Sequence, residues 1–250
     1  MSIIYSVYIL HRLESIKHDL AIKGRCRCTL EHDLISNAKF YTTLESILGK
    51  KMARGIEWFN DWLIMMRAQG YINQNSLRLH YTVTIGGFNG RFSGSYIKPD
   101  CFIVPDDRIL PSVALEVGYR KSYNQLKADA DLLLEGCQGN ICAVIIVKLS
   151  VLGLEDTKCE SGFVEVHEYD AASGAGKMRG RREILYPIPE DHAQQCITLQ
   201  WEDIVRDNMD MLLLRPAPPS PPPLMLDDLR KCVDVGVKRH DIARQISGLK

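Results

Sequence analysis

The sequence has no excess of charge of either sign. Among its 250 residues, 31 Lys and Arg side chains balance 31 Asp and Glu side chains. A protein that holds nucleic acid through its overall charge is usually basic, so the balance argues against such a binder but leaves room for a local basic cleft. Hydrophobic residues make up 46% of the chain and charged residues 25%, which predicts a packed core rather than disorder.

Long apolar runs are also missing. The longest runs fall far short of the ~20 residues that a bilayer-spanning helix needs. The apolar stretch at 3–10 is interrupted by Tyr and Ser and follows no basic residue, so it does not resemble a secretory signal. We therefore expect no signal peptide, no membrane segment and an intracellular location, in the cytoplasm or the nucleus.

Regularly spaced metal and phosphate motifs are missing as well. Eight cysteines are scattered through the chain, which favours reduced thiols over a disulfide framework. The close pair Cys26 and Cys28 lacks the two-residue gap and the second pair of a zinc site. The segment GAGK at 174–177 lacks the upstream glycine and the following Ser or Thr of a phosphate-binding loop. Neither a zinc site nor a nucleotide-binding loop is expected.

Composition divides the chain into four parts. Residues 1–30 form an N-terminal extension, and residues 31–206 carry the periodic apolar patterns of one domain. The proline-dominated sequence RPAPPSPPP lies within 207–223 and predicts an extended, solvated spacer, with a ligand for a polyproline-recognising protein as the alternative. Residues 224–250 are expected to form a helical tail, because residues 226–246 combine helical periodicity with several basic side chains.

Hydrophobic periodicity predicts the order helix, three strands, helix, strand in the domain. The expected elements are a helical region over 31–68 that ends before Gly70, strands at 77–85, 96–104 and 112–117, a helix at 122–135 capped by Ser122, and a buried strand at 141–149. The strand–helix–strand unit favours a parallel pair. The predicted fold class is α/β (α+β), with a central mixed sheet flanked by helices.

The second half of the domain predicts further β structure. Strands at 162–169 and 182–186 are expected to form an antiparallel pair joined by a loose basic segment at 171–181. A short edge strand at 197–199 and a helical turn that begins at Trp201 are expected to follow.

Two carboxylates fall inside apolar strands. Asp100 lies in YIKPDCFIV at 96–104, and Glu116 lies in VALEVG at 113–118. A carboxylate is expensive to bury without a cation or a donor, and two that point the same way repel each other unless a metal ion lies between them. Because hard oxygen ligands suit Mg²⁺ or Mn²⁺, we predict an ion site at Asp100 and Glu116.

The order of Pro-Asp, a loop, an apolar strand ending in Glu, a helix and a buried strand resembles the PD-(D/E)xK superfamily of nucleases. The sequence pattern PD…PxxALEVGY…LxxDA also resembles a fungal group of restriction-endonuclease-like proteins of unassigned function. The resemblance covers about residues 40–150 and implies a restriction-endonuclease-like core. It implies metal-dependent cleavage of phosphodiester bonds in nucleic acid or, as in inactive relatives, a module that only binds nucleic acid or protein.

Carried over by position, the resemblance implies Asp100 and Glu116 as metal ligands. The main-chain carbonyl of Val117 and the carboxylate of Glu57, on the preceding helix, would be further oxygen ligands. Gly118 stands where the superfamily has its catalytic lysine. Because that lysine would orient the attacking water and offset charge on the phosphate, this departure weakens the prediction of cleavage.

Another residue would have to supply the missing amine. Lys98 is the preferred candidate, because strand alternation would put it on the same face as Asp100. The alternatives are Lys121, at the start of the predicted helix, and Lys127, within it. The basic and polar side chains around the helix start are expected to contact nucleic acid, and these are Arg120, Lys121, Gln125 and Lys127.

Each candidate also has a purely structural interpretation. Asp100 could accept backbone donors where proline interrupts the strand. Glu116 could form a structural ion pair with Lys98 or Arg120. Glu57 would more often be a solvated or paired helix residue, and Gly118 could meet a need of the backbone or allow another segment to approach closely.

Overall fold

The structure analysed is a computed structural model. It describes residues 52–73, 75–81, 83–106, 108–151, 158–206 and 219–248, of which 52–54 and 239–248 are described by backbone alone. These residues belong to one compact unit, Lys50–Lys250. The predicted N-terminal extension at 1–30, and the part of the predicted helical region before residue 52, lie outside the described residues.

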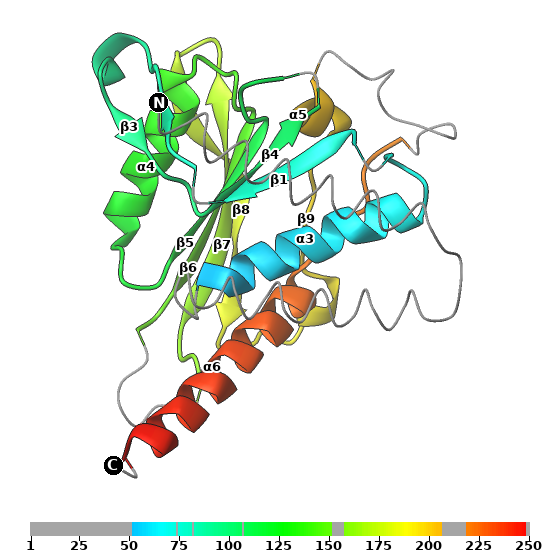
Figure 1. Cartoon of the computed structure of the whole chain (residues 1–250), viewed down its shortest axis with the longest axis vertical. Helices are drawn as coiled ribbons and strands as arrows, with labels where there is room; N and C mark the ends of the chain where they lie inside the picture. The colour runs from blue at the N-terminus through cyan, green and yellow to red at the C-terminus, as the bar shows by residue number, and fades with distance from the viewer. Residues whose placement is uncertain are drawn as a thin grey trace, which may run out of the picture. The chain divides into compact units, whose positions relative to one another are not determined.

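A six-stranded mixed sheet forms the centre of this unit (Figure 1). Its strands, in spatial order, are β1 (Leu77–Tyr81), β4 (Cys101–Pro105), β5 (Val113–Gly118), β6 (Ala143–Leu149), β7 (Gly162–Asp170) and β8 (Ala175–Tyr186). Strands β5 and β6 run parallel, and every other neighbouring pair in this sheet is antiparallel. The predicted mixed sheet and its parallel pair are therefore confirmed.

Two helices cover opposite faces of strand β5 (Figure 1). A Cβ added at Gly55 of helix α3 (Met52–Ala68) would lie 2.6 Å from Cγ2 of Val117. A Cβ added at Gly118 would lie 2.2 Å from Cδ1 of Leu126, which belongs to helix α4 (Tyr123–Gly136). Because successive side chains of a strand point to opposite faces, α3 packs on the Val117 face and α4 on the Gly118 face. Double coverage explains why every residue of β5 is buried.

The predicted start of helix α4 is confirmed in detail. The Ser122 side chain accepts a hydrogen bond from the Gln125 backbone N–H, and the Gln125 side chain accepts one from the Ser122 backbone N–H. This reciprocal capping box satisfies two backbone donors that a helix start would otherwise leave unpaired. Gln125 therefore serves the helix cap, which limits its availability for the predicted nucleic-acid contact.

Two predicted strands are divided in the structure. The strand expected at 77–85 ends at Tyr81, and β2 (Ile85–Gly86) pairs instead with β3 (Tyr96–Ile97) in a separate two-stranded sheet. The 3₁₀ turn η1 (Gly90–Phe92) lies between them. The strand expected at 96–104 is interrupted at Pro99, as predicted, because proline has no N–H to donate to a ladder.

The prediction of a loose segment at 171–181 is wrong, because most of these residues belong to a strand. Strand β8 begins at Ala175 and continues to Tyr186, with a register shift between Val164 and Val166 of its partner β7. Lys177 and Arg179 each form an ion pair with Glu168 on β7. These cross-strand pairs depend on residues distant in sequence, so the glycine-rich and basic composition of the segment did not reveal them.

The last residues of the predicted solvated spacer lie against helix α3. Pro221 is buried, and the carbonyl oxygen of Pro222 accepts a hydrogen bond of 2.8 Å from Trp62 Nε1. Trp58 Nε1 donates at 3.0 Å to the carbonyl oxygen of Met225. Buried indole N–H groups need acceptors, and the extended segment supplies them, so the expectation of a fully solvated spacer is wrong at its C-terminal end.

Helix α6 (Leu226–Gly248) confirms the helix predicted at 226–246, and it packs against the rest of the unit. The chain reaches it through the turn η2 (His192–Gln194), strand β9 (Cys196–Ile197), helix α5 (Trp201–Val205) and strand β10 (Leu224–Met225), which pairs with β9. Among the described residues no helix meets the length and apolarity needed to cross a membrane.

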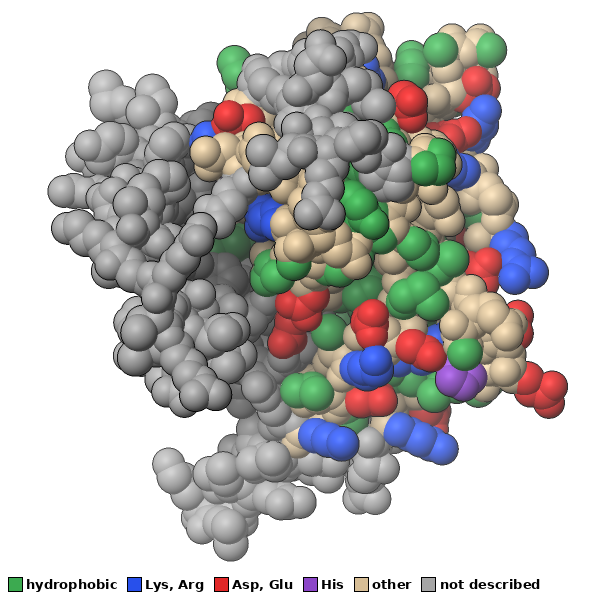
Figure 2. All heavy atoms as spheres, turned by 90° about the vertical axis from the view of Figure 1, so that its right-hand side faces the viewer, with side chains coloured by type: hydrophobic (Ala, Val, Ile, Leu, Met, Phe, Trp, Pro, Cys, Tyr) green, Lys and Arg blue, Asp and Glu red, His purple; other side chains and the backbone are tan. Residues whose placement is uncertain are grey.

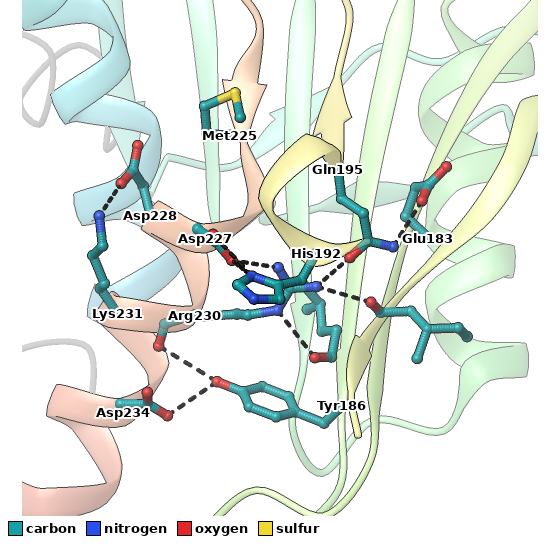
Figure 3. A network of polar contacts seen from close by, with 12 residues as sticks. Glu183, Tyr186, His192, Gln195, Met225, Asp227, Asp228, Arg230, Lys231 and Asp234 are labelled. Carbon is teal, nitrogen blue, oxygen red and sulfur yellow. Dashed lines mark hydrogen bonds and ion pairs between the residues drawn. The ribbon is translucent and has the colours of Figure 1, made fainter. Parts of the chain in front are cut away.

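Arg230 anchors helix α6 to strand β8 (Figure 3). Its side chain is 4% exposed, and its guanidinium donates to the carbonyl oxygens of Ile184 and Leu185 at 3.0 Å and 3.1 Å. It also binds the side chains of Gln195 and Asp227. A planar guanidinium with five donors can join these groups at once, so one side chain connects the helix to the edge strand.

Replacing Arg230 is expected to destabilise the fold. Arg230→Met removes the shared partner of two backbone carbonyls and leaves Asp227 without its buried cation, so the free energy of unfolding should fall by about 3 kcal/mol. Urea denaturation followed by circular dichroism measures this change. Lys231→Met is the matched control, because Lys231 is exposed and, among the described residues, pairs with exposed Asp228; equal urea midpoints for the two variants would contradict the anchoring role.

Candidate functional site

Asp100 and Glu116 lie beside each other at one end of the central sheet. The β4–β5 register pairs Cys101 with Leu115, so the residues next to them, Asp100 and Glu116, fall at the same level. Glu116 shares the face of β5 that carries Gly118 and that α4 covers. Asp100 is 4% exposed and Glu116 is 0% exposed. The predicted proximity of the two carboxylates is therefore present in the structure.

Hydrogen bonds satisfy these carboxylates only in part. Asp100 Oδ2 accepts the backbone N–H of Val117 at 2.6 Å, and Glu116 Oε2 accepts Lys121 Nζ at 3.0 Å. Glu116 Oε1 is buried and has no hydrogen-bond partner among the described residues. A buried oxygen without a donor loses its hydration and gains nothing in return, so this atom is where a cation would contribute most.

Burial makes both carboxylates weak acids. Loss of hydration raises the pKa of Asp100 from 3.8 to about 6, although the Val117 N–H and Lys121 act in the opposite direction. Loss of hydration, together with repulsion from Asp100, raises the pKa of Glu116 from 4.5 to about 8 against the attraction of Lys121. A second negative charge on the pair is therefore unfavourable, as expected for two close, buried carboxylates.

Lys121 is the amine that the structure places at this pair. Its Nζ lies 3.0 Å from Glu116 Oε2 and 2.8 Å from Asp129 Oδ2. Burial alone would lower the pKa of Lys121, but attraction to Glu116 and hydrogen bonds to both carboxylates outweigh it and raise this pKa above its ordinary value. The amine is therefore a fixed positive charge between a strand residue and a helix residue.

Asp129 belongs to this site, and sequence reasoning missed it. The residue follows Leu126 by three positions in helix α4, and Leu126 faces the sheet. Side chains three residues apart lie on neighbouring parts of a helix surface. The sequence pattern LxxDA also contains Asp129, but this residue was assigned no role from the sequence, because it resembles an ordinary solvated helix residue.

Gly118 gives a packing reason for the missing lysine. A Cβ at this position would lie 2.2 Å from Cδ1 and 2.9 Å from Cγ of Leu126, which is 0% exposed. Any larger side chain would therefore require the side chain of Leu126 to shift. The interpretation that another segment approaches Gly118 closely is therefore supported, and Leu126 fills the space beside it.

Lys98, the preferred amine of the sequence prediction, is exposed and forms no contact with Asp100 or Glu116 in the described part of the chain. Strand β3 ends at Ile97 and β4 begins at Cys101. The argument from strand alternation assumed a continuous strand, so it does not apply across this interruption. No contact in the structure supports the assignment of Lys98.

The other predicted site residues are spread around the pair. Arg120 is exposed and forms no ion pair with a described residue, whereas Lys127 pairs with Asp131 within helix α4. Glu57 is half-buried on α3, the helix that covers the opposite face of β5. Val117 contributes its N–H to Asp100, and the ligand role of its carbonyl stays a prediction.

The described side chains do not form a complete metal cage. Among them, no group of three or more His, Cys, Asp and Glu residues is arranged to hold a metal ion. Mg²⁺ commonly keeps several water ligands and uses only one or two carboxylates of the protein. Two carboxylates with one unsatisfied oxygen are compatible with that mode of binding.

Comparison of the chain with protein-family models, with curated proteins and with solved structures finds no match.

The titration of the carboxylate pair is expected to make metal-free protein less stable as pH rises. Because the pKa values of both carboxylates are raised on folding, the folded chain binds more protons than the unfolded chain. This difference holds from a pH near the ordinary carboxyl pKa values up to about pH 8. Deprotonation through this window therefore favours unfolding. Urea denaturation in EDTA between about pH 5 and about pH 9 should show a falling free energy of unfolding.

Glu116→Gln cannot ionise and should flatten this dependence, whereas the exposed Glu190→Gln should leave it as in the wild type. A Glu116→Gln protein with the wild-type pH slope would contradict the role of the buried carboxylate.

A side chain at position 118 is expected to destabilise the core. Gly118→Ala should lower the free energy of unfolding by about 2 kcal/mol, because overpacking displaces Leu126. Thermal denaturation measures this effect. Gly86→Ala is the control, since a Cβ there meets no atom closer than 3.8 Å. In a Gly118→Ala background, Leu126→Val should cost less than in the wild type, and strictly additive losses would argue against the steric explanation.

Proposed function

We propose that the chain is a metal-dependent nuclease of the PD-(D/E)xK type, which hydrolyses phosphodiester bonds of nucleic acid at Asp100 and Glu116. The observation that carries the proposal is the unsatisfied Oε1 of fully buried Glu116, beside a second buried carboxylate. A structural ion pair would explain the contact of Glu116 with Lys121. It would not explain why the other carboxylate oxygen of Glu116 is buried without a hydrogen-bond partner among the described residues.

The order of elements supports the proposal. Helix α3, strands β1, β4 and β5, helix α4 and strand β6 follow one another as helix, three strands, helix, strand, apart from the β2–β3 excursion. Strand β5 carries Glu116 and pairs in parallel with β6. This order agrees with the restriction-endonuclease-like core that the sequence resemblance implies. The agreement is an analogy of fold, and function depends on the site.

The donor set fits a hard divalent cation. The carboxylates of Asp100 and Glu116, with the carbonyl of Val117, would hold Mg²⁺ or Mn²⁺. When bound, such an ion makes a bound water more acidic and stabilises negative charge on a phosphate under attack. The two carboxylates would also gain, because a cation removes the repulsion that raises their pKa values.

Lys121 would supply the amine that position 118 lacks. Its ammonium group remains protonated and lies 3.0 Å from Glu116 Oε2. From there it can donate to a phosphate oxygen or to the attacking water, and it can offset charge that develops during hydrolysis. Asp129, at 2.8 Å, restrains the same ammonium group from the helix side.

A second candidate function is a nucleic-acid or protein-binding module without catalysis. The close packing of Leu126 on Gly118 favours it, because it closes the place from which the superfamily's lysine would act. The ion pairs of Lys121 with both Glu116 and Asp129 also oppose a free catalytic amine. Both candidate functions use the same fold, and they differ in whether the protein cleaves the nucleic acid.

Metal binding is expected to raise the melting temperature. At a concentration ten times its Kd, one ion bound only by the folded state adds about 1.4 kcal/mol, or roughly 3–5 °C for a domain of this size. Mg²⁺ or Mn²⁺ should produce this rise in the wild type, and Asp100→Asn and Glu116→Gln should abolish it. A rise that both variants retain would place ion binding elsewhere.

Cleavage separates the two functions. Plasmid DNA, single-stranded DNA and RNA are incubated with Mg²⁺ or Mn²⁺, and the wild type should cut at least one substrate. Lys121→Met should lower the rate at least ~100-fold, the usual scale for losing a positioned donor. Lys127→Met, on helix α4, and Lys98→Met should retain activity. Metal binding without cleavage of any substrate would favour the non-catalytic module, and loss of activity in Lys98→Met alone would restore the original assignment of the amine.

A further inference from the structure

A third buried carboxylate lies in the same row of the sheet as the candidate site. Ile146 of β6 pairs with Glu116 on one side and with Glu165 of β7 on the other. Paired residues of neighbouring strands point to the same face, and strands lie about 4.8 Å apart, which separates the two glutamates by about 10 Å along the row. Glu165 is 1% exposed, so it too requires partners.

Glu165, unlike Glu116, is fully supplied with donors. Arg182 Nε donates to its Oε1 at 2.6 Å, and the Tyr123 hydroxyl donates to its Oε2 at 2.9 Å. His167 Nε2 lies 2.9 Å from the same Oε2. Burial raises the pKa of Glu165, but these hydrogen bonds outweigh it and lower the pKa below its ordinary value. Glu165 is thus a fixed negative charge that holds three side chains.

Arg182 is the side chain that these contacts hold at the surface. Both its Nε and its Nη2 lie 2.6 Å from Glu165 Oε1. Its Cζ lies 3.8 Å above the centroid of the Phe163 ring and 5.0 Å from that of Tyr123, which adds cation–π attraction from two aromatic rings. The Arg182 side chain nevertheless remains 42% exposed. The guanidinium is therefore restrained on several sides, within a side chain that is partly open to solvent.

The position of this guanidinium connects it with the candidate site. Tyr123 opens helix α4 two residues after Lys121, so the helix start contacts both Glu116 and Glu165. A surface ion pair alone contributes little to stability, and burying a carboxylate for that purpose is unfavourable. A preorganised guanidinium loses little freedom when it binds a phosphate, for which its planar fork is well suited. The cluster therefore has the construction of an anion-binding group.

We propose that Arg182 binds a backbone phosphate of the nucleic acid that the carboxylate pair cleaves. This phosphate is not the reacting one but lies further along the substrate strand, in the direction from β5 toward β7. Glu165, Tyr123 and Phe163 position the guanidinium for this contact. The inference rests on the proposed function and adds to it a phosphate-binding residue on strand β8. It requires the substrate strand to cross the end of the sheet from Glu116 toward Arg182.

Nucleic-acid affinity tests the inference without cleavage. Binding of fluorescent single-stranded DNA, double-stranded DNA and RNA is measured by anisotropy in EDTA over a range of salt concentrations. Arg182→Gln should weaken binding about tenfold at low salt and reduce the slope of log K against log salt by about 1, the change expected for one lost phosphate contact. Metal-induced thermal stabilisation should stay as in the wild type, because the carboxylate pair is unchanged.

Arg181→Gln is the matched control. Arg181 is the neighbouring residue, its side chain is 76% exposed, and it pairs with Glu183. Glu183 pairs across the sheet with Val164, whose side chain points to the face opposite that of Glu165. This variant should change affinity less than twofold. An equal loss in both variants would show a general charge effect and overturn the specific contact.

Arg182→Lys separates geometry from charge. It should keep the salt slope while losing severalfold in affinity, because an ammonium group lacks the fork that the Glu165 contacts orient; this variant also serves if Arg182→Gln fails to fold. Wild-type affinity in both Arg182 variants, in a protein that cleaves nucleic acid, would overturn this inference and leave the proposed function intact. A wild-type chain that binds none of the three nucleic acids would overturn both.

Discussion

The burial of Glu116 on a strand that is covered from both sides is the constraint from which the rest of the site follows. Gly55 allows helix α3 to approach one face of β5, and Gly118 allows helix α4 to approach the other. This close packing excludes water from the strand, so a carboxylate there needs partners from the protein or a cation. Lys121 satisfies one oxygen of Glu116 and leaves the other without a partner. The same packing that stabilises the fold therefore creates the demand for positive charge.

The amine at this site shows how far local pattern could predict the structure. Alternation and turn residues predicted the order of helices and strands, and the long apolar strands predicted a sheet covered on both faces. The choice of Lys98 failed to find support because alternation holds only within a continuous ladder, and Pro99 stands between β3 and β4. Lys121 reaches Glu116 from outside any strand, through the turn before α4, and no periodicity describes such a turn.

Residues that join distant segments were beyond the reach of local pattern for the same reason. Asp129 and Glu165 each look like a solvated charge in their own segments. The turn before α4 brings Lys121 to Asp129, and the packing of α4 on the sheet brings Tyr123 to Glu165. The register shift between β7 and β8 and the contact of Pro222 with Trp62 likewise depend on partners that are far away in the chain. Sequence reasoning could find the buried carboxylates because an acid inside an apolar run is conspicuous, whereas their partners are not.

Charged side chains of both signs lie on the face of the protein shown in Figure 2. On that face, acidic and basic side chains are interspersed around hydrophobic ones rather than gathered by sign (Figure 2), in keeping with a net charge of zero. Under the proposed function, this balance of charge favours a nucleic-acid substrate held through a few fixed contacts over one held through a broad basic surface. Restrained cations suit this mode, because each is oriented before the substrate arrives: Lys121 by Asp129 and Glu116, and Arg182 by Glu165. Under the proposed function, the buried acids therefore serve two purposes, since Asp100 and Glu116 would hold the ion while Asp129 and Glu165 aim the positive charges that face the phosphates.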